Sequence, residues 1–327
     1  MRFGFIGAGG IARSALAPAV HAADGAVLQA VAARDADRAR ALEPAGAVHT
    51  DYRALLDDPD VDVVYISLSN ESHAPWTVAA LEAGKHVLCE KPLGLDPAEV
   101  ERMAQAAGAA GRRLVEAFWY RWHPRTRRLE QLLAEGALGP IRHVDAEFSF
   151  AGSAEPRMAG NYRLDPTRGG GALYDVGCYA LSAVHLALGG DVTVLAATGS
   201  RSPQGVDLDV DVRLRADGGP RAGATAAVRC GIWEADRQTL RVEGEGARVE
   251  FPPGDAFTNR AARSSLTITT PDGAVRVEEF APVDPYRLMA EAVAQRVRGG
   301  SAFVVPLEHS RQVAATTAAA LAALPRP

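Results

Sequence analysis

The chain has 327 residues, more than one hydrophobic core usually serves, so its length favours two domains. Its composition, 47% hydrophobic and 23% charged, is that of a globular protein, and the net charge of −5 predicts no nucleic-acid surface. No apolar run approaches the roughly 20 residues that a membrane helix needs, so we expect no membrane partner. Cys89, Cys178 and Cys230 are widely spaced and form no Cys-x-x-Cys pair. We therefore expect reduced thiols in a cytoplasmic protein without a signal peptide or a membrane-spanning segment.

The first part of the chain alternates short apolar runs with helical patterns. The runs expected as strands are residues 2–9, 27–35, 60–69, 85–92 and 112–118, and the helices between them are residues 10–23, 36–46, 74–84 and 96–111. Strands and helices at this spacing form βαβ units and a parallel sheet. We expect an α/β Rossmann domain over residues 1–122.

From Trp122 onward the pattern changes. A helix at residues 124–139, a strand at 141–150 and a long loop at Met158–Arg168 precede an apolar helix at 170–190. Seven alternating strands follow at residues 192–199, 206–215, 221–231, 238–245, 247–252, 265–270 and 274–280, and two helices close the chain at Pro285–Arg298 and Leu307–Leu324. We expect an α+β domain over residues 123–327, built on a large, mainly antiparallel open sheet.

A glycine-rich turn follows the first strand and begins the first helix. Gly7, Gly9 and Ala12 fit G-x-G-x-x-A in the strand–turn–helix context that gives this pattern its meaning. Gly7 permits the tight turn, Gly9 lets the backbone approach a pyrophosphate, and Ala12 allows close helix packing. We expect this turn, with Gly10 and Ile11, to bind a dinucleotide at the helix N-terminus. A tight turn without a ligand is the alternative.

The tip of the second strand indicates which dinucleotide binds. Ala33 is followed by Arg34 and Asp35, and Arg38 lies one helical turn beyond Arg34. Two arginines suit a ribose 2′-phosphate, so we expect NADP as cofactor. Asp35 keeps NAD possible, since an acid at the tip would take the ribose hydroxyl. Solvated surface arginines are the alternative.

Both lysines of the chain, Lys85 and Lys91, belong to the fourth apolar run, whereas the other 33 basic residues are arginine. An amine can lose a proton at working pH and a guanidinium cannot. Lys91 follows Glu90 at the carboxyl end of the strand, where ligands bind in open α/β sheets. We expect Lys91 to act at the nicotinamide and Glu90 to contact the cofactor, with a structural Glu90–Lys91 salt bridge as the alternative. Lys85 is expected to be a surface lysine.

A similar segment follows the third strand. Ser67, Asn70 and His73 come at its carboxyl end, before the next helix. We expect them to line the cofactor groove. The alternative for Asn70, and for Ser72, is capping of that helix.

The helix after Gly169–Gly171 carries Asp175 and Tyr179 four residues apart, and therefore on one face. Beside a lysine, a carboxylate and a phenol make a proton-transfer set, because a nearby ammonium lowers the pKa of a phenol. Structural roles for both residues are the alternative. Residues that could contact a substrate are Trp119, Arg121, Tyr162 and Arg163, and the aromatic and basic residues around Trp119 could equally belong to a domain-junction core.

Several segments together resemble one family. GAGGIA, AALEAGKHVLCEKPL, EAFWYRWHP and GGGALYDVGCYAL are similar to the glucose–fructose oxidoreductase/inositol dehydrogenase (Gfo/Idh/MocA) family. The resemblance implies a Rossmann domain, a sheet domain whose open face forms a homodimer or homotetramer, catalytic roles for Lys91 and Asp175, and a cis peptide before Pro92. Tyr179 stands where inositol dehydrogenases carry histidine, as in dihydrodiol and xylose dehydrogenases. Arg34 and Arg38 match the arginines that hold the 2′-phosphate in the dihydrodiol type.

The expected function is therefore an NAD(P)-dependent oxidoreductase that transfers hydride between the nicotinamide and a sugar or vicinal diol. Lys91 or Tyr179 would accept the hydroxyl proton, and Lys91, Asp175 and Tyr179 would also bind the substrate. A keto-sugar reductase and a non-catalytic nucleotide-binding regulator are the alternatives. We expect no metal, since the eight histidines form no ligand pattern and Asp207, Asp209 and Asp211 alternate along a strand.

Overall fold

The structure is a computed structural model that describes residues 1–152, 160–232 and 235–325. Its contacts divide the chain into two compact units, Met1–Trp122 with Asp284–Ser310, and His123–Val283 with Arg311–Pro327. The sequence predicted that all residues from 123 to 327 form the second domain. The structure differs in one respect, because Asp284–Ser310 belongs to the first unit. Asp284–Ser310 lies with the first unit because its helix packs on the first helix of the chain.

The first unit contains a six-stranded sheet in the order β3-β2-β1-β4-β5-β6, with every pair parallel. Its strands are β1 (Arg2–Ile6), β2 (Val27–Ala32), β3 (Val48–His49), β4 (Val63–Ile66), β5 (His86–Cys89) and β6 (Leu114–Glu116). Its helices are α1 (Ala17–Ala22), α2 (Ala36–Arg40), α3 (Tyr52–Leu56), α4 (His73–Glu82), α5 (Pro97–Ala110) and α8 (Pro285–Val297). The predicted Rossmann sheet is confirmed, and the short β3 and α3 are additions to it.

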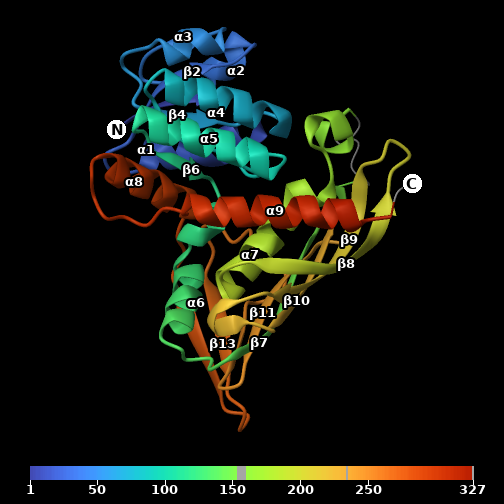
Figure 1. Cartoon of the computed structure of the whole chain (residues 1–327). Coiled ribbons are helices and arrows are strands. Elements are labelled where there is room, and N and C mark those ends of the chain that lie inside the picture. The colour runs from blue at the N-terminus through green and yellow to red at the C-terminus, as the bar shows by residue number, and fades with distance from the viewer. Residues whose placement is uncertain (153–159, 233–234, 326–327) are drawn as a thin grey trace. The chain divides into compact units, whose positions relative to one another are not determined.

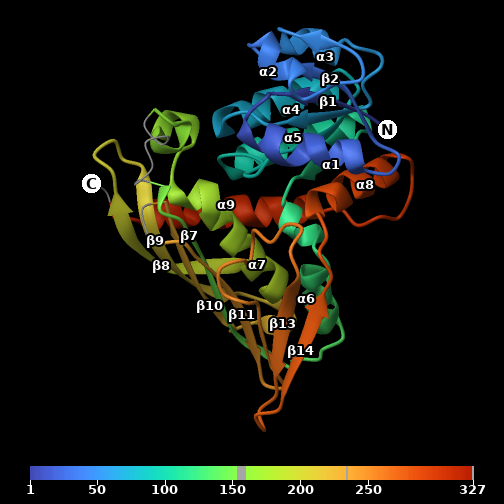
Figure 2. The same ribbon diagram turned by 180° about the vertical axis from the view of Figure 1, so that it is seen from behind.

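Helices cover both faces of this sheet. Its strands are therefore buried on both sides, which explains why they are apolar throughout. Right-handed crossovers on either side of β1 place α1, together with α8, on one face and α4 with α5 on the other (Figures 1 and 2). All four residues of β4 are buried, as expected for a strand covered on both sides. The strand order reverses between β1 and β4, so the carboxyl ends of these strands border the crevice where such sheets bind ligands.

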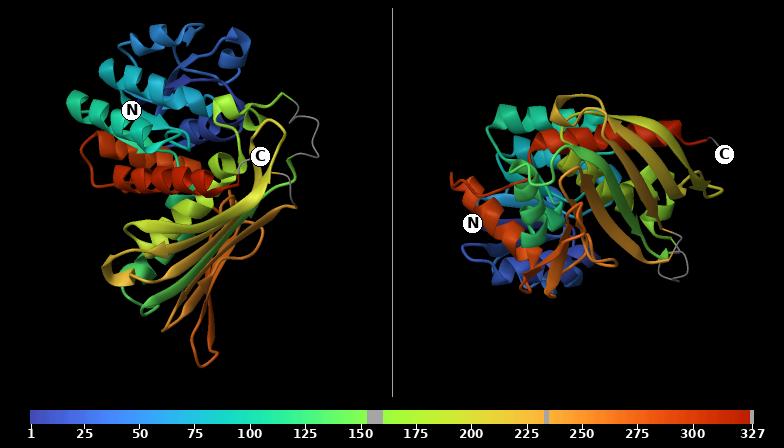
Figure 3. Two further views of the ribbon diagram at one scale, coloured as in Figure 1. Left: turned by 45° about the vertical axis from the view of Figure 1, so that its right-hand side comes forward. Right: turned by 90° about the horizontal axis from the view of Figure 1, so that it is seen from below.

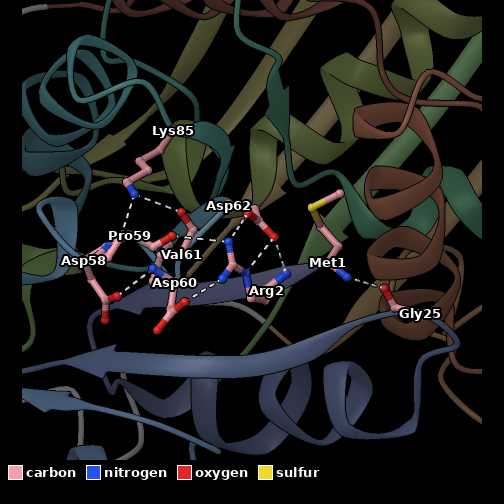
Figure 4. A network of polar contacts seen from close by, with 9 residues as sticks. All are labelled: Met1, Arg2, Gly25, Asp58, Pro59, Asp60, Val61, Asp62 and Lys85. Carbon is pink, nitrogen blue, oxygen red and sulfur yellow. Dashed lines mark hydrogen bonds and ion pairs between the residues drawn. The ribbon is translucent and has the colours of Figure 1, made fainter.

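Lys85 lies at the opposite, amino edge of the sheet and is buried (Figure 4). Its Nζ donates to Asp58 O at 2.6 Å and Val61 O at 2.9 Å, and only 9% of the residue is exposed. The expectation of a surface lysine was therefore wrong, because the 58–61 turn closes over the amine. Two carbonyls this near suit a compact ammonium better than a planar guanidinium, which gives Lys85 a structural role.

The second unit is built on an eight-stranded sheet in the order β14-β13-β12-β11-β7-β10-β9-β8. Its strands are β7 (Ile141–Ser149), β8 (Val192–Arg201), β9 (Asp207–Ala216), β10 (Thr225–Gly231), β11 (Arg237–Gly244), β12 (Arg248–Glu250), β13 (Ser264–Thr269) and β14 (Val275–Phe280). Only β7 and β10 pair in parallel, so the predicted mainly antiparallel sheet is confirmed. The predicted Met158–Arg168 loop begins outside the described residues.

Helices pack on one face of this sheet (Figure 3). Its helices are α6 (Pro124–Ala134), α7 (Cys178–Leu188) and the greater part of α9 (Leu307–Ala323). α7 contacts β7, β10 and β11, whose inward residues are apolar. The other face carries ion pairs between side chains of one strand or of neighbouring strands, such as Arg241–Asp145 and Arg248–Glu250. Alternate residues of each strand thus serve a packed face and a charged face.

One stretch, Pro166–Leu188, is long and apolar enough by composition to cross a membrane, although we expected none. Of its most apolar window, 89% is buried, and ten of the eleven residues of α7 are buried. A helix that is apolar on all sides is the core helix of a domain when its neighbours cover it. The stretch is therefore weak grounds for a membrane span.

Candidate functional site

The glycine loop after β1 is fixed at its first glycine and open beyond it. Gly7 has a φ of +103°, and a Cβ there would lie 2.5 Å from Ser67 O, so only glycine fits. Its N–H donates to Ala32 O at 2.9 Å. A Cβ at Gly9 would come no nearer than 3.8 Å to Ser67 O, and one at Gly10 would meet nothing within 4 Å. The backbone from Gly9 onward is thus accessible to a phosphate.

The surroundings of this loop fit a dinucleotide. Ala12 is fully buried at the start of a π-helical turn, Ala12–Leu16, which leads into α1. Ile11 is 39% exposed, an uncommon state for a large apolar side chain. The buried hydroxyl of Ser67, at the end of β4, has no hydrogen-bond partner among the described residues. A bound dinucleotide would cover the Ile11 side chain and would give the Ser67 hydroxyl a hydrogen-bond partner.

The tip of β2 resolves the competition between Asp35 and its neighbouring arginines. The Asp35 carboxylate caps α2, accepting from Asp37 N at 2.9 Å and Arg38 N at 3.2 Å. The Arg38 guanidinium donates to Ala8 O in the glycine loop at 3.0 Å, and Arg34 is exposed. Because Asp35 is engaged by the helix, the tip offers cations beside the loop, as a 2′-phosphate requires.

The segment after β4 folds into a 3-10 turn, Asn70–Ser72, that leads directly into α4. Ser72 makes no side-chain capping hydrogen bond to α4, and Asn70 is buried. His73 is fully enclosed between two backbone carbonyls, with Nδ1 2.7 Å from Pro92 O and Nε2 3.3 Å from Leu68 O. Burial lowers the pKa of His73 and keeps its ring neutral. His73 therefore connects the loop after β4 to the turn that carries Lys91.

Lys91 lies in the turn directly beyond β5. The peptide between Lys91 and Pro92 is cis, as the family resemblance implied. Glu90 is buried and accepts from Tyr65 Oη at 2.7 Å and from Lys91 N at 3.3 Å. Glu116, at the end of β6, accepts from Leu93 N at 2.8 Å. Sequence reasoning missed Glu116, although an acid ending an apolar strand was a visible signal.

Trp119 and Arg121 are buried within the first unit. Trp119 stacks on Tyr286 of α8 with ring centroids 4.7 Å apart. Arg121 donates to His309 Nε2 at 3.1 Å and lies over the Phe303 ring at 5.7 Å. Their exposed fractions, 4% and 6%, are those of core residues. These contacts place both residues in the core of the first unit, and substrate binding by either residue stays a prediction.

In the second unit, Arg163 holds Asp175. Arg163 Nε donates to Asp175 Oδ2 at 2.8 Å, and its guanidinium lies over the Tyr162 ring at 4.9 Å. Asp175 is the main cause that raises the pKa of Arg163, and Tyr179 adds to it. The Tyr179 ring is buried, with ring centroids 5.5 Å from Phe148 and 6.1 Å from Phe257. A carboxylate, a guanidinium and a phenol thus share one apolar-walled region of this unit.

The three glycines before this helix let distant backbone and side chains approach. A Cβ at Gly170 would lie 2.5 Å from Arg163 O, which accepts from Gly171 N at 3.0 Å. Gly171 has a φ of +128°, and a Cβ there would fall on the Asp207 carboxylate. Asp207 is buried and accepts from Leu173 N at 2.8 Å in the π-helical turn Leu173–Gly177. Asp207, expected as a member of a polar strand face, instead fixes the start of the helix that carries Asp175.

Gly171→Ala is expected to lower the free energy of unfolding by at least about 2 kcal/mol, because it adds strain and a clash with Asp207. Chemical denaturation followed by circular dichroism measures the change. Gly108→Ala is the matched control, since its Cβ would meet nothing within 4 Å in α5 and should be neutral or stabilising. Equal stability of the two variants would contradict this account of the glycines.

An open glycine loop at the switch point of a parallel sheet, with a second α+β unit, defines a dinucleotide-binding oxidoreductase of two-domain type. Comparison with known families agrees. Residues 1–118 match the oxidoreductase family with an NAD-binding Rossmann fold, and residues 126–250 match the Gfo/Idh/MocA C-terminal domain. The chain belongs to the Gfo/Idh/MocA family of oxidoreductases, which confirms the resemblance seen in the sequence.

Individual relatives match from about two thirds of the chain to nearly all of it. A D-xylose 1-dehydrogenase (NADP(+)) from Haloferax volcanii is 39% identical over 97% of this chain and 95% of its own length. A trans-1,2-dihydrobenzene-1,2-diol dehydrogenase from Sus scrofa is 36% identical over 66% of this chain and 63% of its own. The crystal structure of a 3-ketoreductase from Actinomadura kijaniata with NADP and TDP-benzene has a TM-score of 0.88 at 31% identity, covering 99% of this chain and 98% of that one.

Proposed function

We propose that this chain is an NADP-dependent dehydrogenase that oxidises a carbinol of a sugar or of a vicinal diol. The observation that carries the proposal is the open glycine loop beside β4, with Lys91 at the carboxyl end of the next strand, β5. Support comes from the xylose and dihydrodiol dehydrogenases, which are similar in sequence.

The chain's own residues would hold NADP in three places. The backbone of Gly7–Ala12 would receive the pyrophosphate at the helix N-terminus. Arg34 and Arg38 would pair with the 2′-phosphate, because guanidinium forms bidentate hydrogen bonds with phosphate oxygens. Ser67 and Asn70, buried beyond β4, would line the groove, whereas Glu90 and His73 would act mainly by fixing the loops around it.

When bound, NADP+ would supply the hydride acceptor for oxidation of the carbinol. Lys91 or Tyr179 would take the hydroxyl proton as the hydride leaves, and the two would titrate as a coupled pair. Asp175 would orient the substrate hydroxyl, because Arg163 holds its carboxylate in place at 2.8 Å. Tyr162, flanked by the Arg163 and Arg168 guanidiniums at 4.9 and 5.7 Å, would form a wall for the substrate.

A second candidate is the reverse reaction, reduction of a keto-sugar. The observation that favours it is the similarity to the Actinomadura kijaniata 3-ketoreductase over 99% of the chain. The same ammonium or phenol would then donate the proton to the new hydroxyl. Both candidates use one site, so the equilibrium between substrate and product decides the direction.

We also propose that the charged face of the second unit's sheet joins copies of this chain into a homodimer or homotetramer. Its acids and bases alternate along and across neighbouring strands, as in Arg241 with Asp145 and Arg248 with Glu250, so a copy turned by a two-fold axis would meet complementary charges.

The three buried free cysteines support a reducing, cytoplasmic location.

The function is tested by NADP+ reduction, followed at 340 nm, over aldoses including D-xylose, polyols, inositols and aromatic dihydrodiols. At least one class should be oxidised, and Lys91→Met should lose about 10²-fold or more of kcat while still binding NADP+. Lys85→Met is the control, because Lys85 supports the opposite edge of the sheet and its loss should cost stability but not turnover per folded molecule. Binding of NADPH without oxidation of any substrate would instead support a regulator.

The cofactor preference is tested by replacing both Arg34 and Arg38 with alanine. NADPH affinity should fall by about 10²-fold or more, because two charge-assisted contacts to the 2′-phosphate are lost. NADH affinity should hold, since NADH has no phosphate there. Fluorescence titration of the two cofactors measures both, and an equal loss of affinity for both would contradict the assignment.

A further inference from the structure

The turn that carries Lys91 is held by side chains at three consecutive residues. Each comes from a different element, namely the ends of β5 and β6 and the start of α4. The contacts are Lys91 N to Glu90 Oε2 at 3.3 Å, His73 Nδ1 to Pro92 O at 2.7 Å, and Leu93 N to Glu116 Oε1 at 2.8 Å.

The three holding side chains are between 1% and 6% exposed. A buried polar group costs free energy unless it is hydrogen-bonded, so moving the turn would leave several such groups unpaired. The His73 ring must donate from Nδ1, because a carbonyl oxygen only accepts. All these residues belong to the first unit, and the turn is therefore fixed within it.

Glu116 differs from His73 and Glu90 because one of its carboxyl oxygens is not used in holding the turn. Its Oε2 is buried and has no hydrogen-bond partner among the described residues. The pKa of Glu116 is raised to about 7, mainly by burial; Glu90 contributes to this increase, and the Lys91 ammonium opposes it. The Ser310 hydroxyl and the Leu93 N–H also favour the ionised form. Near neutral pH the carboxyl therefore exists in both protonation states.

We propose that Glu116 is a positioning residue for Lys91, holding its turn through Leu93 and changing, by gain or loss of one proton, the charge beside the Lys91 amine. As pH rises through 7, Glu116 becomes negative and stabilises the ammonium form of Lys91. Below that pH the carboxyl is neutral, and this stabilisation is lost. For turnover, the inference rests on the function proposed above, whereas its electrostatic part is independent of any substrate.

The small number of lysines makes this coupling measurable in the intact protein. Labelling with [13Cε]lysine gives two NMR signals, one from Lys85 and one from Lys91, and Lys91→Met assigns them. The Lys91 signal should shift with an inflection near pH 7, which Lys85, at the other edge of the sheet, should lack. In Glu116→Gln the inflection should disappear, while the glutamine oxygen still accepts from Leu93 N.

Glu99→Gln is the matched control. The Glu99 carboxylate accepts from Leu95 N at 2.8 Å, two residues further along the same segment, but it is only half-buried. This variant should keep the inflection of the Lys91 signal. A wild-type signal without an inflection near pH 7, or a Glu116→Gln signal that retains it, would overturn the proposal.

Two further measurements keep the test decisive if Glu116→Gln does not fold, and distinguish failure of this proposal from failure of the proposed function. If Glu116→Gln fails to fold, Glu116→Asp keeps the carboxyl one methylene further away, and its inflection should move or weaken; an unchanged inflection would overturn the coupling. With any substrate found in the screen, the pH profile of kcat should lose its inflection near 7 in Glu116→Gln while the NADP+ Kd stays within about twofold. If no substrate is found, the NMR result still decides the electrostatic claim, so the two failures are distinguishable.

Discussion

The carboxyl edge of the first sheet depends on buried polar groups that pair with the backbone of the neighbouring loops. His73, Glu90 and Glu116 would each be costly in an apolar interior, and each is hydrogen-bonded to the backbone of the turn that follows β5. The requirement for these bonds fixes where the loops lie, and it therefore fixes the direction from which Lys91 leaves the sheet. The close approach of the Gly7 backbone to Ser67 O fixes the position of the glycine loop in the same way.

The second unit uses the same physical device. Asp207, from β9, is buried where it can accept from the backbone at the start of the helix carrying Asp175, and glycine at position 171 leaves room for it. Arg163 then holds the Asp175 carboxylate from the loop before the glycines. Each unit thus carries the residues proposed to act on the substrate on backbone that is secured by buried hydrogen bonds, as a preorganised site would require.

The sequence predicted the elements well because the burial of a strand or helix face is written in local periodicity. It could not predict partners that come from distant segments. Lys85 was expected at the surface because the sequence around it does not indicate that the distant 58–61 turn covers its amine. The role of Glu116 was not predicted, and Asp207 was assigned only to a strand with alternating acids, because a buried acid gains its role only from the backbone it meets. The return of Asp284–Ser310 to the first unit likewise depends on packing between segments far apart in the chain.

The central proposal is that Lys91 and Tyr179 act on the same substrate oxygen. A crystal structure of the protein with NADP+ and a substrate identified by the screen tests it most directly. We predict that Lys91 Nζ and Tyr179 Oη both lie about 2.6–3.2 Å from the reacting oxygen, with the carbinol carbon facing the nicotinamide. Placement of the amine and the phenol in separate crevices would contradict the account.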